Sequence, residues 1–134
     1  MQAEGLAGQT VVSISPAGIV AIIEDDDAMR QAIRRVLETE GFMTAAFDSA
    51  EAFLASDALS RARCLVLDIR LPGISGLDLH EHLLATEYAV PTVFITAHED
   101  TRVRRLLKNG TYCCLFKPFL GETLIQAVTR AIAR

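Results

Sequence analysis

The chain has 134 residues, a hydrophobic fraction of 51%, a charged fraction of 22% and a formal net charge of −4. This length supports one domain with a substantial core, and the composition is that of an ordinary globular protein. The net negative charge gives no argument for a nucleic-acid or membrane partner. The longest apolar runs are strand-sized, which excludes a membrane-spanning helix.

Residues 1–18 are mostly small and polar, and they lack the basic start and apolar block of a secretory signal. We expect a flexible tail here, with an extra edge strand as the alternative. The three cysteines, at positions 64, 113 and 114, are odd in number and fall in strand-like sequence. They favour reduced thiols in a cytoplasmic protein over a disulfide framework.

From Ile19 onward, apolar runs of strand length alternate with segments of helical periodicity. The strands are expected at residues 19–23, 42–47, 64–68, 91–95 and 112–116. The helices carry apolar residues at Met29, Ile33, Val36 and Leu37, at Phe53 and Leu54, at Leu77, Leu79, Leu83 and Leu84, at Val103, Leu106 and Leu107, and at Leu124, Ile125, Val128 and Ile132. Strict alternation predicts a single α/β domain over residues 19–134, a three-layer α/β/α sandwich around a five-stranded parallel sheet.

Polar residues follow four of these strands: Glu24 and Asp25, Asp68, Thr96, and Lys117. The carboxyl ends of parallel strands share one edge of the sheet, so we expect these side chains to converge. Carboxylates about 4 Å apart repel by roughly 4 kcal/mol per pair at an effective dielectric near 20, and their hard oxygens suit Mg²⁺. Lys117 would add a cation and Thr96 a hydroxyl donor, with Asp68 as the nucleophile that forms an acyl phosphate.

Each of these residues also has an ordinary structural explanation. The acids from Glu24 to Asp27 suit a solvated helix N-terminus, and we expect no more than this of Asp26 and Asp27. Thr96 suits a helix cap, and Lys117 suits a turn. Coincidence at four successive strand ends is a poor explanation of the whole set, so the pattern favours a site that stabilises a phosphoryl group.

The motifs at these strand ends resemble the receiver domain of two-component response regulators. They are Ile22–Asp26, Leu67–Gly76, Phe94–His98 and Phe116–Phe119. The segment Phe47–Phe53 also resembles the receivers that are often fused to LuxR-type DNA-binding domains. The resemblance covers nearly all of the chain beyond the tail and implies a flavodoxin-like fold with strand order 2-1-3-4-5.

The resemblance implies a bacterial signalling protein, not an enzyme, that catalyses only its own phosphoryl transfer and slow autodephosphorylation. Asp68 would accept a phosphoryl group from a histidine kinase or a phosphotransfer protein, and Thr96 and Lys117 would contact that group. The implied Mg²⁺ ligands are Glu24 through a water molecule, Asp25, Asp68 and the backbone carbonyl of Arg70. The family also usually has a cis peptide bond where Lys117 meets Pro118.

Two departures from the family pattern concern the later strands. The interval from Thr96 to Lys117 is one residue shorter than usual, which we expect to alter the entry or first turn of the fourth helix. The family's switch aromatic falls at Cys114, with Tyr112 as a substitute on the same face. Signal transmission is therefore expected to differ at the surface of the fourth helix, fifth strand and last helix, through which a homodimer could form.

These departures motivate an alternative function, a pseudo-receiver that binds proteins independently of phosphorylation. A phosphatase of haloacid-dehalogenase type would need a second aspartate where Arg70 stands, which argues against that class. We expect the long side chain of Arg70 to screen the acyl phosphate from water instead. The sequence leaves open the cognate kinase, the output, and whether the chain is a stand-alone regulator or part of a longer one.

Overall fold

The structure, a computed structural model, describes residues 18–108 and 113–133. The predicted tail, apart from Gly18, and Tyr112 lie outside these residues. The strands are β2 (Ile19–Ile23), β3 (Thr44–Phe47), β4 (Ala62–Asp68), β5 (Thr92–Thr96) and β6 (Cys113–Phe116). All neighbouring pairs are parallel, in the order β3-β2-β4-β5-β6, which confirms the predicted order 2-1-3-4-5.

The helices are α1 (Asp27–Thr39), α2 (Ala50–Leu54), α3 (Ala58–Arg61), α4 (Gly76–Leu84), α5 (Thr101–Lys108) and α6 (Gly121–Ala133). Helix α1 begins where Asp26 accepts a hydrogen bond from the Met29 N–H at 2.8 Å, so Asp26 has the expected helix-terminal role. Helix α3 was not predicted, because four residues are too few to show a helical period. Among the described residues, no helix is long and apolar enough to cross a membrane.

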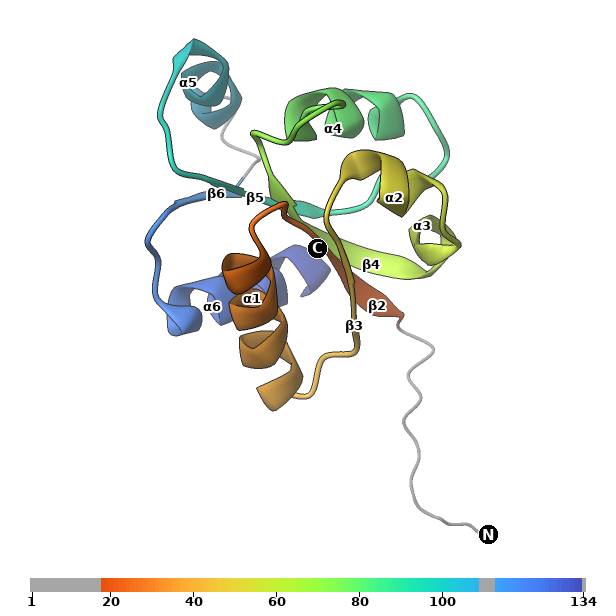
Figure 1. Ribbon diagram of the computed structural model, residues 1–134, viewed down its shortest axis with the longest axis vertical. Coiled ribbons are helices and arrows are strands. Elements are labelled where there is room, and N and C mark those ends of the chain that lie inside the picture. Colours follow the sequence, from red (N-terminus) through yellow and green to blue (C-terminus); the bar gives the residue numbers. More distant parts are fainter. Residues whose placement is uncertain (1–17, 109–112, 134) are drawn as a thin grey trace, which may run out of the picture.

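The sheet is covered on both faces, and the strand residues alternate between two apolar clusters. In Figure 1, α1 and α6 lie together below the sheet, and α2 to α5 lie above it. The lower cluster joins Val20, Ile22, Val66 and Ile95 to α1 and α6. The upper cluster joins Ile23, Leu65, Leu67 and Phe94 to α2, α3, α4 and α5. The predicted three-layer arrangement is confirmed.

Several predicted details differ from the structure, and among them β4 begins earlier, at Ala62, and β5 covers Thr92–Thr96. Phe42 precedes β3, because its N–H donates to the Leu37 carbonyl as α1 ends. Leu84 and Leu107, two of the apolar residues of the predicted helices, are 53% and 36% exposed. Leu84 lines a groove between α4 and α5 with Leu106, and a second groove lies between α1 and α6, where Val36 and Ile125 line it.

Candidate functional site

The carboxylates predicted from the strand ends do converge. Ligand oxygens of Glu24, Asp25 and Asp68 all lie within 4.8 Å of one another. Glu24 and Asp68 are buried, at 0% and 4% exposure, while Asp25 is exposed. The register explains this, since β2 and β4 pair directly up to Ile23 and Leu67, and the carboxylates come next. Two buried acids thus share one edge with an acid that faces solvent.

Lys117 supplies the positive charge between the buried acids. Its Nζ lies 2.7 Å from Glu24 Oε1 and 3.0 Å from Asp68 Oδ2. The backbone N–H of Lys117 donates to the Thr96 carbonyl at 2.8 Å, which fixes the residue just beyond β6. The Lys117–Pro118 peptide bond is cis, as expected. Burial alone would lower the pKa of Lys117, but its hydrogen bonds to Glu24 and Asp68 outweigh this and raise the pKa.

Glu24 is held by backbone groups as well as by Lys117. Its Oε2 accepts a hydrogen bond from the Asp26 N–H at 3.1 Å, and its own N–H donates to the Phe47 carbonyl at 3.0 Å. Burial, with help from neighbouring Asp68, raises the pKa of Glu24, although Lys117 and the Asp26 N–H act in the opposite direction. The direction of the Glu24 pKa shift is therefore set chiefly by burial.

The loop after Asp68 is shaped around its carboxylate. Asp68 Oδ1 accepts the Arg70 N–H at 2.9 Å. Gly76 comes so close that a Cβ there would collide with the Asp68 carbonyl oxygen, which explains glycine at the first residue of α4. Gly73 has a φ of +73°, and the next N–H, that of Ile74, donates to Glu51 at 3.0 Å. This hydrogen bond lowers the pKa of Glu51.

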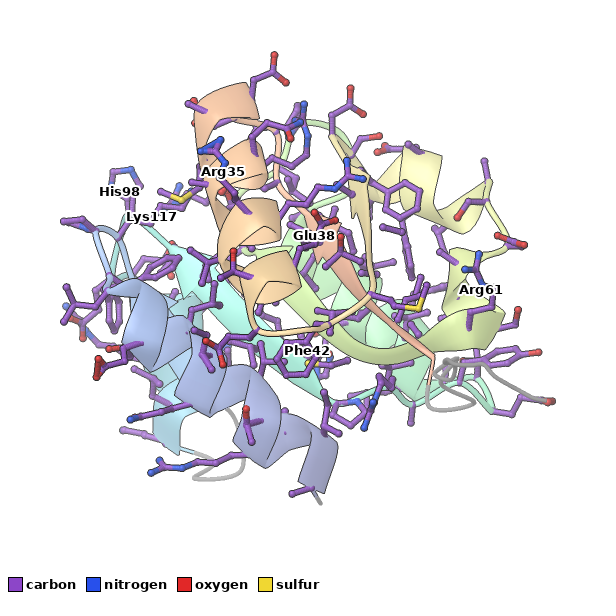
Figure 2. The ribbon with its side chains drawn as sticks, turned by 90° about the horizontal axis from the view of Figure 1, so that it is seen from below. Arg35, Glu38, Phe42, Arg61, His98 and Lys117 are labelled. Atoms are coloured by element: carbon purple, nitrogen blue, oxygen red, sulfur yellow. The ribbon has the colours of Figure 1, made fainter. Side chains whose placement is uncertain are left out.

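Thr96 lies at the same edge, but its hydroxyl is engaged elsewhere. The hydroxyl donates to the His98 carbonyl at 3.1 Å and accepts from the His98 N–H at 3.2 Å. Figure 2 shows His98 and Lys117 at this one end of the molecule. The predicted contact of Thr96 with a phosphoryl group would require the hydroxyl to leave His98, and it stays a prediction.

The side chain of Arg70 has a partner that the sequence did not suggest. Its Nη2 lies 2.6 Å from Asp100 Oδ2, across the edge of the sheet. Asp100 in turn caps α5, because its Oδ1 accepts the Val103 N–H at 3.0 Å. The only sequence signal for this role was an aspartate just ahead of the fourth helical segment.

The position of the usual aromatic residue on β6 is filled by Cys114, which is half-buried against the cluster that contains Phe94. Burial raises the pKa of this thiol to about 11, and it raises that of Cys64, on β4, to about 12. Both thiols are therefore protonated at neutral pH and behave as small apolar groups.

The donor set fits a divalent cation. Three carboxylates with hard oxygens converge, one of them from the solvent side, and a single lysine offsets two buried charges. A cation would relieve the repulsion that contributes to the raised pKa of Glu24. The three carboxylates could thus hold a metal ion.

Comparison with known proteins gives consistent matches. A profile of the family described as "Response regulator receiver domain" matches residues 20–129. Nodulation protein W of Bradyrhizobium diazoefficiens is 38% identical over 131 residues, which are 97% of this chain and 57% of that protein. The response regulator StyR is 37% identical, with a TM-score of 0.75, over 86% of this chain and 59% of that one. The chain thus spans just over half the length of these two proteins.

A more distant structure agrees in fold. The chemotaxis protein CheY4 of Vibrio cholerae is 20% identical, with a TM-score of 0.75, and the match covers 85% of this chain and 98% of that one. At this identity the likeness concerns the fold alone, and it confirms the predicted flavodoxin-like architecture.

Proposed function

Because the chain belongs to the response regulator receiver domain family, whose general function is phosphorylation-dependent signalling, we propose that Asp68 is its phosphoryl acceptor. The membership confirms the resemblance drawn from the motifs. The observation that carries the proposal is the position of Asp68, a buried carboxylate between Lys117 and the acids Glu24 and Asp25. The pseudo-receiver alternative has no observation that favours it over phosphorylation.

In the proposed reaction, one carboxylate oxygen of Asp68 attacks the phosphorus of a phosphohistidine on a histidine kinase or phosphotransfer protein. A P–O bond to Asp68 forms and the P–N bond breaks, and the departing imidazole keeps the electron pair and takes up a proton. The Lys117 ammonium, 3.0 Å from Asp68 Oδ2, would then pair with a phosphoryl oxygen. Thr96 would offer its hydroxyl to the same group.

The metal that we propose is Mg²⁺, held by Asp25, Asp68, the backbone carbonyl of Arg70, and Glu24 through a water molecule. When bound, it would offset the charge on the phosphoryl oxygens and the carboxylates. Lys117 and the backbone N–H groups of Asp26 and Arg70 keep the carboxylates oriented before the cation arrives. A homodimer through α5, β6 and α6 and a cytoplasmic location also stay proposals.

Incubation with acetyl phosphate and Mg²⁺, followed by intact mass spectrometry, tests this function. We expect one phosphoryl group on the wild-type chain and none on Asp68→Asn. Asp57→Asn is the matched control, since Asp57 lies ahead of α3 and pairs with Arg61 there. An adduct that persists in Asp68→Asn, or no adduct on any variant, would contradict the proposal.

A further inference from the structure

A continuous path of contacts leads from Asp68 to α5. The Arg70 N–H donates to Asp68 Oδ1, and the guanidinium of the same residue pairs with Asp100 Oδ2 at 2.6 Å. The other oxygen of Asp100 accepts the Val103 N–H inside the first turn of α5. One arginine thus contacts both the acceptor carboxylate and the residue that begins α5.

Helix α5 depends on this attachment more than the other long helices do. Val103 is its only buried residue, and its other ion pair to a neighbouring helix joins Arg102 to Asp78 of α4 at 3.1 Å. Figure 1 shows α5 beside α4, at the edge of the upper layer. A change at Asp100 therefore acts on a helix whose apolar contact with the core comes from buried Val103 and partly buried Leu106.

A phosphoryl group on Asp68 would compete with Asp100 for the same guanidinium. It replaces one negative charge with about two and presents three acceptor oxygens, an arrangement to which arginine binds in bidentate fashion. The Arg70 side chain starts two residues from Asp68 and is half-exposed, so no packed core blocks its rotation. A guanidinium that turns toward the phosphoryl oxygens would draw Nη2, the atom in contact with Asp100, away from that carboxylate.

We propose that Arg70 senses the phosphoryl group, exchanging Asp100 for the phosphoryl oxygens and so coupling the acceptor to α5. The exchange releases Asp100 from its ion pair while the phosphoryl group gains a second cation beside Lys117. This exchange of ion pairs needs no aromatic side chain on β6, where this chain has Cys114. The inference rests on the proposed function and adds to it a route from the acceptor to α5.

Binding linkage turns the exchange into a measurable quantity. If Arg70 must leave Asp100 to bind the phosphoryl group, then removing the charge of Asp100 should strengthen phosphoryl binding by the free energy of the Arg70–Asp100 ion pair. For a partly exposed pair this amounts to about two- to fivefold in affinity. Asp100→Asn is the suitable variant, because asparagine can still accept the Val103 N–H and cap α5.

The probe is beryllium fluoride with Mg²⁺, a non-covalent mimic of the phosphoryl group, titrated into wild type, Asp100→Asn, Arg70→Gln and the double variant. We expect about two- to fivefold tighter binding in Asp100→Asn, weaker binding in Arg70→Gln, and no further effect of Asp100→Asn in the Arg70→Gln background. Arg102→Gln is the matched control: it breaks the other α5 ion pair and should bind as wild type does.

Hydrogen exchange of residues 101–108 gives a second readout, because a purely structural ion pair would leave this exchange unchanged when the probe binds. We expect the probe to speed exchange of α5 in wild type, and Asp100→Asn to show that faster exchange before the probe is added. Equal affinities in wild type and Asp100→Asn, or additive effects in the double variant, would overturn the inference while leaving the proposed function intact. Failure of the wild type both to bind the probe and to accept a phosphoryl group would overturn both.

Discussion

The helices before and after β6 are held to the sheet by different forces. Helix α6 buries Leu124, Ala127, Val128 and Ala131 and packs beside α1, close to the Lys117 ion pairs. Helix α5 buries Val103 alone and is fastened by exposed ion pairs from Asp100 and Arg102. Apolar burial is indifferent to a new charge at Asp68, while ion pairs are not. We therefore expect a new charge at Asp68 to affect α5 more than α6.

The largest effect on stability is expected from Lys117→Gln. It leaves Glu24 and Asp68 buried without their cation, so we expect the free energy of unfolding to fall by about 3 kcal/mol, as measured by urea denaturation. Millimolar Mg²⁺ should recover part of this loss by binding the same carboxylates in the folded state. A loss no greater than that of Arg102→Gln would show that the buried charges do not depend on Lys117.

A matched pair of valines tests the contrast between the two helices. Val128 on α6 and Val103 on α5 are both 0% exposed. Val128→Ala should lower the free energy of unfolding by about 2 kcal/mol, from two lost methyl groups and the cavity that they leave. Val103→Ala should cost less, because its effect cannot exceed the free energy that detaches α5 locally. Equal losses in both variants would mean that α5 is held as firmly as α6.

The effect of pH on the stability of Lys117→Gln should be smaller than these losses, and its direction follows from the pKa of Glu24. Burial raises the pKa of Glu24 above its unfolded value of 4.5, and loss of Lys117 should raise it further. As the pH falls through this raised pKa, the folded state takes up a proton before the unfolded state does, so the variant should regain stability relative to wild type. Thermal unfolding of both proteins across mildly acidic pH measures this, and a constant difference would contradict it.

The stability that Lys117 contributes to the wild-type protein is lost at high pH rather than at low pH. Its pKa is raised above 10.5 in the folded state by Glu24 and Asp68, against the effect of burial. Its stabilisation is therefore complete below the unfolded pKa and is lost only as the pH rises through the folded value. Near neutral pH, the difference between wild type and variant reports on the carboxylates.

The sequence predicted what depends on strand direction alone. Glu24, Asp68 and Lys117 meet because parallel strands end at one edge, and this needs no knowledge of loop geometry. The Arg70–Asp100 pair was missed because it joins side chains 30 positions apart through two loops. Leu84 was misplaced because its helical spacing could not reveal the groove between α4 and α5. Ion pairs between loops and the distance between neighbouring helices depend on the tertiary structure, so the sequence pattern alone did not predict them.

The proposed function requires that Asp68 itself carries the phosphoryl group. Borohydride reduces an acyl phosphate of aspartate to homoserine, which marks the modified residue permanently for peptide mass spectrometry. After acetyl phosphate, Mg²⁺ and borohydride, we predict homoserine at position 68 and unmodified Glu24 and Asp25. Reduction at either of those acids, or at none of the three in a protein that gains a phosphoryl group, would contradict the account.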